Sequence, residues 1–525
     1  MKKGQLVLTL TLAAGLAGVA WAQDEPSPAP APVPAFGQEN PAPSVAENPP
    51  ISAIDQPGLD PHASPESFLL YGLHFSQSVD SNVGNNLGDS SIASVTRGLG
   101  SVTLQRLWKN YDVAVDYIGG VAYYDQKGLG LEQLQQMDLD NRINWKRGQL
   151  AIRDSFSYLP EGIFGFGAYG GGGAYNSGLG SLGAGMLGAG AFGGQGNVFN
   201  GGTGVSVGQV PRLNNLGLAD VVEELSPKSS VTASVGYAIV HFYGSLENIA
   251  GSQENLNFIG SKELTGQFGY DRILTPKDQV ALSYGYQDFD FSTVGTKFHT
   301  NVIQAMYGHR ISGRLNFLIG LGPQFTHLDS NPVVFVCAIP GLPENLCPTG
   351  LGTFVTIPQQ ANHTGIAGRL LISYRFPKTT MSLTYQRYTT SGNGIFAGSR
   401  SDIARADFSR PLSRVWDIFA DFGFSKNARL QVPGESVSAS ILYYGYAGAG
   451  VHRQLSRSLR AYFSYQFNEL GFNSNVCPPF SQVDGASCVS EFTAQPVSAV
   501  PLSNLSQRQV GTIGLDWTPR PRRLD

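Results

Sequence analysis

Four cysteines are the residues whose type and spacing most directly predict a chemical bond. They fall in two neighbouring pairs, Cys337 with Cys347 and Cys477 with Cys488. Four cysteines allow three pairings, and proximity in the sequence favours the two local ones. In an oxidising compartment each local disulfide would close a loop of about 11 residues and contribute roughly 2 to 3 kcal/mol by restricting the unfolded chain. Neither pair has histidine ligands nearby, so stabilised loops are predicted rather than a metal site.

Two glycine-rich runs match functional motifs by letter only. Residues 165–170 read GFGAYG, like a dinucleotide-binding loop, and residues 204–208 read GVSVG, like a serine nucleophile elbow. Both motifs require a strand, a turn and a helix within an α/β unit, and that context is missing here. Such matches are expected by chance in glycine-rich sequence, so neither predicts a site.

The eight histidines also give no catalytic or metal-binding pattern. Residues such as His74, His241, His309 and His452 stand singly, without a motif-level acid or nucleophile beside them. A catalytic triad in a sheet would need its members to converge on one face of neighbouring strands. The sequence therefore predicts no enzyme and no cofactor.

The elements that carry these residues alternate between polar and apolar positions. In residues 279–287, Val280, Leu282, Tyr284 and Tyr286 fall on one face, and Gln, Ala, Ser and Gly fill the positions between them. Successive side chains of a strand point to opposite faces, so such segments predict strands with one apolar face and one polar face. Residues 366–373, 381–386 and 459–468 alternate in the same way.

Short turns carrying Lys or Arg separate pairs of these strands. Eight are recognisable, at residues 108–110, 145–148, 226–229, 275–278, 311–314, 376–379, 410–414 and 455–458. Eight turns separate nine hairpins and hence predict about 18 strands, with long excursions at the opposite end. This pattern predicts an all-β fold: a transmembrane antiparallel β-barrel over residues 65–525, with short periplasmic turns and long extracellular loops.

Composition fits a wall that faces lipid on one side. Only 14% of the residues are charged, against about 25% in an ordinary soluble domain, and the mean hydropathy is −0.09. The four tryptophans after residue 22 lie beside short turns or at the C-terminal end, which predicts an interfacial aromatic belt of Trp108, Trp145, Trp416 and Trp517. A net charge of −4 gives no basic field for nucleic acid. A soluble β-sandwich would also alternate, but its buried face would be more aliphatic.

Charged residues inside the strands are predicted to face the lumen, because Arg or Lys at mid-membrane would cost about 2 to 4 kcal/mol. Acids and arginines are mixed, which suggests weak charge selectivity; salt bridges that merely hold the wall together are the alternative. The predicted lumen residues are Asp112, Asp116, Asp138, Asp140, Arg142, Arg153, Arg369, Arg375, Arg405, Asp407, Asp417, Asp421 and Arg460.

Together these features resemble bacterial outer-membrane β-barrel proteins of the porin-like type. The resemblance covers the barrel region by architecture, without a diagnostic motif. It implies the outer membrane of a Gram-negative-type bacterium, surrounding lipid, and the barrel-insertion machinery as a partner. Such proteins often end on an aromatic residue, whereas this chain continues beyond Trp517 into a short basic tail.

The N-terminal part is predicted to lie outside the barrel. Residues 1–22 have the basic, apolar and small-residue regions of a signal peptide. Residues 23–64 hold many of the chain's 31 prolines and predict a disordered periplasmic linker, either a plain spacer or a segment that binds a periplasmic partner. Residues 162–208 are extremely rich in glycine and predict either a constriction or plug in the lumen, or an external loop.

The favoured function is an outer-membrane channel for passive diffusion of small hydrophilic solutes. Two alternatives remain: an export channel for a polymer such as exopolysaccharide, and a non-transporting surface adhesin or structural barrel. A track of aromatic residues along the lumen would favour polymer export.

Overall fold

A computed structural model of the chain describes the barrel wall and parts of the connections. The described residues are 50–52, 67–83, 92–125, 130–159, 211–243, 245–246, 256–257, 259–292, 294–331, 333–337, 352–356, 358–376, 378–392, 396–430, 441–472, 481–484, 487–490, 496–497 and 506–524. The predicted signal peptide (1–22), the glycine-rich segment (162–208) and most of the predicted linker (23–64) lie outside them.

Eighteen long strands form one antiparallel sheet, which confirms the predicted number. They are β1 (Phe68–Asp80), β2 (Ala93–Leu107), β3 (Tyr111–Tyr124), β4 (Gly130–Trp145), β5 (Gly148–Leu159), β6 (Arg212–Ser226), β7 (Ser229–Phe242), β10 (Ser261–Thr275), β11 (Asp278–Phe291), β12 (Thr296–Arg310), β13 (Leu315–Ser330), β16 (Gln359–Phe376), β17 (Thr379–Thr390), β18 (Ser399–Pro411), β19 (Trp416–Arg429), β20 (Ile441–Gln454), β21 (Leu459–Phe472) and β25 (Ser506–Trp517).

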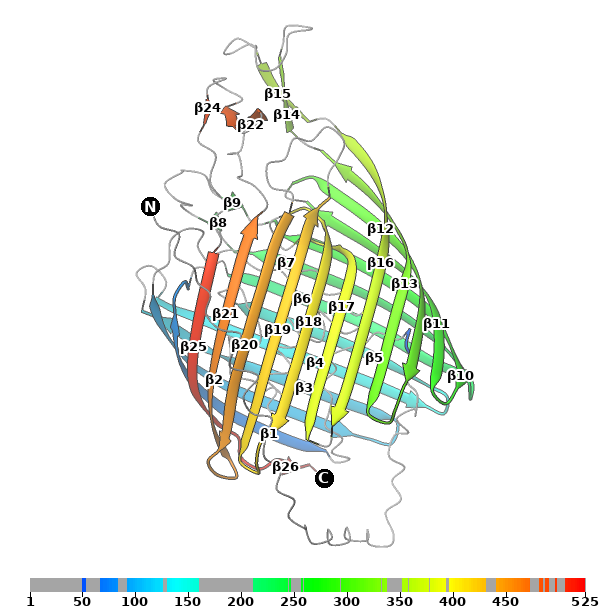
Figure 1. Cartoon of the computed structure of the whole chain (residues 1–525), viewed down its shortest axis with the longest axis vertical. Coiled ribbons are helices and arrows are strands. Elements are labelled where there is room, and N and C mark those ends of the chain that lie inside the picture. Colours follow the sequence, from blue (N-terminus) through cyan, green and yellow to red (C-terminus); the bar gives the residue numbers. More distant parts are fainter. Residues whose placement is uncertain are drawn as a thin grey trace, which may run out of the picture. The chain divides into compact units, whose positions relative to one another are not determined.

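The sheet closes on itself. Each long strand pairs with the next one along the chain, and β25 returns to β1 in a register that runs from Leu73↔Trp517 to Asp80↔Val510. Figure 1 shows these strands side by side around the barrel. After β25, the short strand β26 (Arg522–Arg523) pairs with the first two residues of β1, so the basic tail stays on the wall.

All eight predicted short turns are present, because each falls between two paired strands of the wall. Serine or threonine stabilises several of them by accepting hydrogen bonds from the backbone. In one turn Thr275 Oγ1 accepts from the N–H of Lys277 and of Asp278, each at 3.1 Å, and Ser456 Oγ does the same for Ser458 and Leu459 at 3.3 and 3.1 Å. Such side-chain contacts favour tight reversals.

Three of the connections at the other end of the barrel carry small additional strands. These are β8 (Ser245–Leu246), β9 (Leu256–Asn257), β14 (Val333–Cys337), β15 (Gly352–Thr356), β22 (Ser481–Asp484), β23 (Ser487–Ser490) and β24 (Pro496–Val497). In Figure 1 the labelled members of this set stand at the end opposite to the short turns. The predicted separation of short and long connections is therefore observed.

Alternation divides the wall into an apolar outer face and a polar inner face. On β10, Leu264, Phe268 and Tyr270 are exposed, whereas Glu263, Thr265 and Gln267, at the alternate positions, are buried on the inner side. An exposed band of large apolar side chains would be unfavourable in water, at roughly 25 cal/mol per Å², and is stable against lipid. Among the described residues there is no helix long and apolar enough to cross a membrane. The chain is a transmembrane β-barrel of the outer-membrane type.

Substitution by arginine distinguishes the two faces. Phe268 lies in the middle of β10 on the outer face. Gly285 lies on the adjacent strand β11, next to the residue that pairs with Phe268, and faces the lumen. A side chain at position 285 would enter open space. We expect Phe268→Arg to lower the free energy of unfolding by about 2 to 4 kcal/mol, because the charge enters hydrocarbon, and Gly285→Arg to lower it much less. Urea unfolding in lipid vesicles measures both. Equal losses would contradict the assignment of faces.

Candidate functional site

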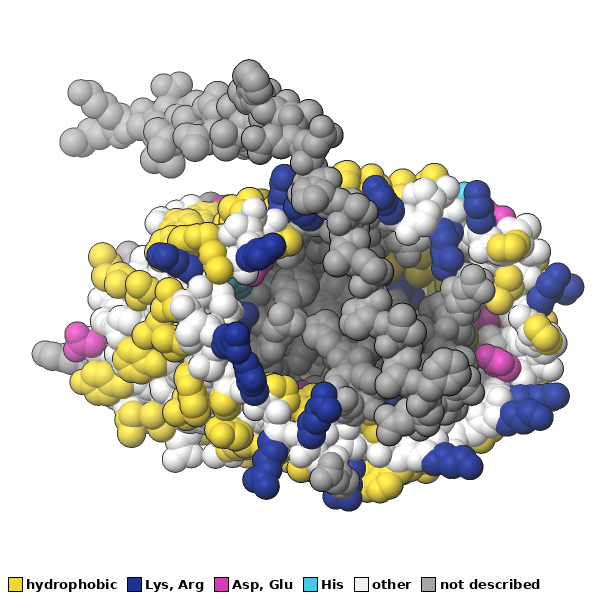
Figure 2. Space-filling view, turned by 90° about the horizontal axis from the view of Figure 1, so that it is seen from below, with side chains coloured by type: hydrophobic (Ala, Val, Ile, Leu, Met, Phe, Trp, Pro, Cys, Tyr) yellow, Lys and Arg dark blue, Asp and Glu magenta, His cyan; other side chains and the backbone are white. Residues whose placement is uncertain are grey.

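The candidate site is the inner surface of the barrel. Inward-facing positions of the wall carry serine, threonine, glutamine and charged side chains, and the rim beside the short turns is basic. Figure 2 views the barrel from this end and shows Lys and Arg side chains around the opening, with apolar side chains over the outer surface. A polar lumen inside an apolar shell is the arrangement that lets water and solutes enter a membrane barrel.

Six of the predicted lumen residues come together on β3, β4 and β5. Alternation places all six on the inner face, beside the inward-facing Asp220 of β6. We call this group the acidic wall: Asp112, Asp116, Asp138, Asp140, Arg142, Arg153 and Asp220.

Ion pairs connect the members of the acidic wall. Arg142 Nη2 lies 2.6 Å from Asp140 Oδ2, and Arg153 lies 3.4 Å from Asp140 and 2.9 Å from Asp220. Asn144 Nδ2 donates to Asp112 Oδ2 at 3.0 Å. The group has five carboxylates and two guanidiniums, so acidic side chains outnumber basic ones. The sequence analysis did not predict Asp220 as a lumen residue, although it lies two positions after Leu218 and therefore on the same inward face of β6.

The remaining predicted lumen residues are more scattered. Arg369 is buried on the inner face of β16, and Asp417 is exposed at the start of β19. Arg460 faces inward on β21. Arg375, Arg405, Asp407 and Asp421 lie in wall strands, but their side chains are outside the described set, so their lumen positions remain predictions.

Arg460 belongs to a polar group at the seam where β25 meets β1. Its Nη2 lies 3.2 Å from Asp516 Oδ2, and the other oxygen of Asp516 lies 2.9 Å from His74 Nδ1. His74 Nε2 is 2.9 Å from the hydroxyl oxygen of Ser101. Side chains from β21, β25, β1 and β2 are thus connected across the inner face of the seam.

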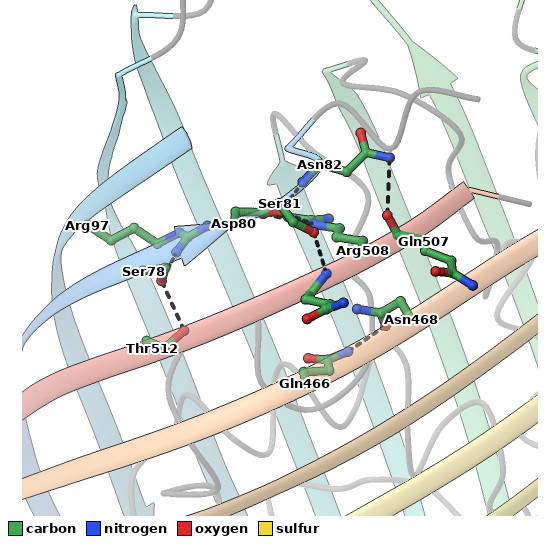
Figure 3. A network of polar contacts seen from close by, with 11 residues as sticks. Ser78, Asp80, Ser81, Asn82, Arg97, Gln466, Asn468, Gln507, Arg508 and Thr512 are labelled. Carbon is green, nitrogen blue, oxygen red and sulfur yellow. Dashed lines mark hydrogen bonds and ion pairs between the residues drawn. The ribbon is translucent and has the colours of Figure 1, made fainter. Parts of the chain in front are cut away.

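A second group lies further along the seam and is drawn in Figure 3. Arg508 Nε donates to both carboxylate oxygens of Asp80, at 3.1 and 2.9 Å, and both side chains are almost completely buried. Arg97 Nη1 donates to Ser78 Oγ at 2.9 Å, and Ser78 Oγ is 3.0 Å from Thr512 Oγ1. These contacts add side-chain bonds to the backbone pairing of β1 with β25.

The predicted aromatic belt lies where the strands meet the short turns. Trp108, Trp145, Trp416 and Trp517 are all exposed. Trp145 Nε1 donates to Glu223 at 2.6 Å. The guanidinium carbon of Arg106 lies 5.2 Å from the ring centroid of Trp108, and that of Arg453 lies 5.1 Å from the ring centroid of Trp416. An exposed apolar ring with a polar partner suits the membrane interface.

The structure does not describe the four cysteine side chains, but it does allow a search of the described residues for metal ligands. Cys337 lies in β14 and Cys488 in β23, but their side chains are outside the described set, as are Cys347 and Cys477 altogether. The two disulfides remain predictions. Among the described residues, no three His, Cys, Asp or Glu side chains are grouped so that they could hold a metal ion.

Part of the predicted linker occupies an unexpected position. Ser52 is buried against the inner wall on β7 and β10, and Ile51 packs against the neighbouring strands. Sequence composition gave no sign of this contact, because it depends on side chains that are 180 or more positions away.

Comparison with known sequences gives no relative. No protein-family model matches the chain. No curated protein matches it either.

Several solved structures align with most of the chain at low similarity. The open form of the ferric-catecholate import receptor Fiu from E. coli K12 aligns with a TM-score of 0.40 and 11% identity, covering 85% of this chain and 81% of that one. The outer membrane protein OpdK and OccK2 (OpdF), both from Pseudomonas aeruginosa, give TM-scores of 0.35 and 0.36 at 9% and 7% identity, each covering 86% of this chain. They cover 98% and 97% of the respective chains. At this level of similarity the function must be inferred from the barrel itself.

The seam pair gives a stability test. Arg508→Ala leaves the Asp80 carboxylate buried without its cation, so we expect a loss of about 3 to 5 kcal/mol in the free energy of unfolding, measured by urea titration in vesicles. Asp80→Asn combined with Arg508→Gln should lose less, since no lone charge remains. Arg400→Ala removes an exposed arginine and serves as the control. A loss for Arg508→Ala no larger than for the control would exclude a role of the pair in closing the barrel.

Proposed function

We propose that the protein is an outer-membrane channel for passive diffusion of small hydrophilic solutes. The observation that carries this proposal is the closed sheet of 18 strands with a polar, charged inner face and an apolar outer face. Barrels of about 16 strands or more are wide enough for an aqueous channel, whereas barrels of about eight are filled by side chains. In this proposal solutes move through the polar lumen down their concentration gradient.

The acidic wall supports a preference for cations within this proposal. Its carboxylates outnumber its arginines and lie together on one side of the lumen. Inward-facing basic side chains on other strands, such as Arg369 and Arg97, oppose this field. The expected preference is therefore modest, in line with the mixed charges seen in the sequence.

Polymer export receives less support from the lumen. One described aromatic group of the lumen, on β11 and β12, consists of Phe289, Phe291 and Phe298, whose ring centroids are 4.5 to 6.4 Å apart. Each ring is at most 1% exposed and packs with Leu328, Ala361 and Leu430. A second group, on β19 to β21, contains the inward-facing Phe419, Tyr444 and Tyr462, and each of these side chains is at most 7% exposed. Buried rings offer little open stacking surface to a sugar chain, so the diffusion channel is preferred.

The function is tested on protein refolded into liposomes. We expect swelling of liposomes in solutions of small sugars and stepwise conductance in planar bilayers, because the polar lumen admits water and ions. Liposomes with heat-denatured protein are the control. Folded protein that conducts no ions and admits no sugar, even after deletion of residues 23–64, would contradict the channel.

Charge selectivity tests the acidic wall. We expect Asp112→Asn combined with Asp116→Asn to lower the permeability ratio of K⁺ to Cl⁻ about twofold, because two carboxylates leave the lumen surface while the arginine pairs stay intact. Reversal potentials in a KCl gradient measure the ratio. Asp329→Asn removes a carboxylate from the outer face of β13 and should leave the ratio unchanged. An unchanged ratio in the double variant would mean that ions do not pass this wall.

A further inference from the structure

Two residues ahead of the barrel, Ile51 and Ser52, lie against its inner wall. They belong to the same compact unit as the wall strands, although their composition predicts a periplasmic linker. Ser52 is only 1% exposed. A linker residue buried to this degree requires a wall that is shaped to receive it.

All polar groups of Ser52 have partners on β7 and β10. Its N–H donates to Asp271 Oδ1 at 2.9 Å and its hydroxyl donates to Asp271 Oδ2, while the hydroxyl oxygen lies 2.8 Å from Thr232 Oγ1. Gln267 Nε2 donates to its carbonyl oxygen at 2.7 Å. Hydrogen bonds to a charged carboxylate are stronger than neutral ones, so Asp271 contributes most to holding the serine.

A glycine makes room for this contact. Gly269 lies on the inner face of β10 between Gln267 and Asp271. A Cβ added there would lie 2.4 Å from Ser52 Oγ and 2.5 Å from Ser52 Cβ. Atoms cannot approach this closely, and the Cβ of Ser52 cannot turn away by a side-chain rotation. Ser52 therefore fits only because position 269 has no side chain.

Ile51 covers an apolar patch on the neighbouring strands. It packs against Ala281, Met306 and Leu318, which lie on the inner faces of β11, β12 and β13, with Leu371 of β16 beside them. A Cβ at Gly308 would be 3.5 Å from Ile51 Cγ2, an ordinary contact. This patch would otherwise face the aqueous lumen, so its burial by Ile51 is favourable.

We propose that this part of the lumen is a peptide-binding site that the chain fills with its own residues 50–52. The site recognises an aliphatic side chain followed by a residue that presents an N–H, a hydroxyl and a carbonyl oxygen. Asp271, Thr232 and Gln267 form hydrogen bonds with the polar groups, and the apolar patch around Met306 packs against the aliphatic side chain. The bound segment reduces the open cross-section of the lumen and so acts as a built-in blocker; this last consequence rests on the proposed channel function.

Cross-linking tests the site without relying on transport. The hydroxyl contact between Ser52 and Thr232 places their side chains within disulfide range. We expect the pair Ser52→Cys with Thr232→Cys to form a disulfide in the folded full-length chain, identified by peptide mapping under non-reducing conditions. Ser52→Cys with Ser464→Cys, on β21 away from the site, is the control. Equal cross-linking of the two pairs, or none in the first, would overturn the proposal.

A glycine pair tests the shape of the site. In the cross-linking background, Gly269→Ala should lower the yield of the 52–232 disulfide about tenfold or more, because the added methyl group displaces residue 52 and its backbone hydrogen bond to Asp271. Gly285→Ala, on the lumen face of the adjacent β11 with nothing within 4 Å, should leave the yield unchanged. If Gly269→Ala does not fold, Ile51→Asp replaces it, since this change leaves the wall intact. An undiminished yield in the folded variant would overturn the proposal.

Conductance separates the binding site from the channel. If both proposals hold, Gly269→Ala has a higher single-channel conductance than Gly285→Ala, and the oxidised 52–232 pair has a lower conductance than its reduced form. If the 52–232 cross-link forms but the protein never conducts, the proposed peptide site is supported and the proposed channel function is contradicted. If the protein conducts normally but the specific cross-link does not form, the channel is supported and the peptide site is contradicted.

Discussion

Pairing of every backbone N–H and C=O within the hydrocarbon layer is the constraint on which this structure depends. An unpaired backbone group in lipid costs several kcal/mol, so an open sheet edge cannot lie there. The pairing of β1 with β25 removes both edges at once. The return of the last strand to the first follows from this requirement, and closing a wholly antiparallel sheet requires an even number of strands. Short turns suffice at one end because each strand pairs with its immediate successor.

Closure of the sheet into a barrel fixes whether each side chain of the wall points to the lumen or to the lipid. Charged side chains are then stable only at positions that point to the lumen. Once a strand is paired on both sides, a shift by one residue would move its whole polar set into lipid. The charges of β3 to β6 therefore collect on the lumen side, where they form the acidic wall. The same rule places Asp80 and Arg508 on the inner face of the seam, where they neutralise each other. A charge distribution useful for a channel thus arises from a requirement of folding.

The sequence predicted those features that depend on neighbouring residues. Turns such as Thr275 to Asp278 combine a capping hydroxyl, proline and lysine, and alternation on β11 identifies its inner face without knowledge of any other strand. It did not predict which inward side chains meet. Asp80 and Arg508 are 428 positions apart, and their contact depends on the register of the closed sheet, which no local pattern contains. The alternation of His74, Ser76, Ser78 and Asp80 did contain the signal for an inward-facing row on β1.

Residues 51 and 52 show how composition alone can misjudge a short stretch of chain beside a barrel. Low apolar content predicts disorder because such a segment cannot build a core of its own. A barrel, however, already presents an ordered inner surface with hydrogen-bonding groups and an apolar patch, and the segment needs only to satisfy that surface. Ser52 does so through Asp271, and Ile51 through the side chains around Met306. The strand number sets the largest lumen that the wall can enclose. The residues that bind to the inner face then determine how much of it is open.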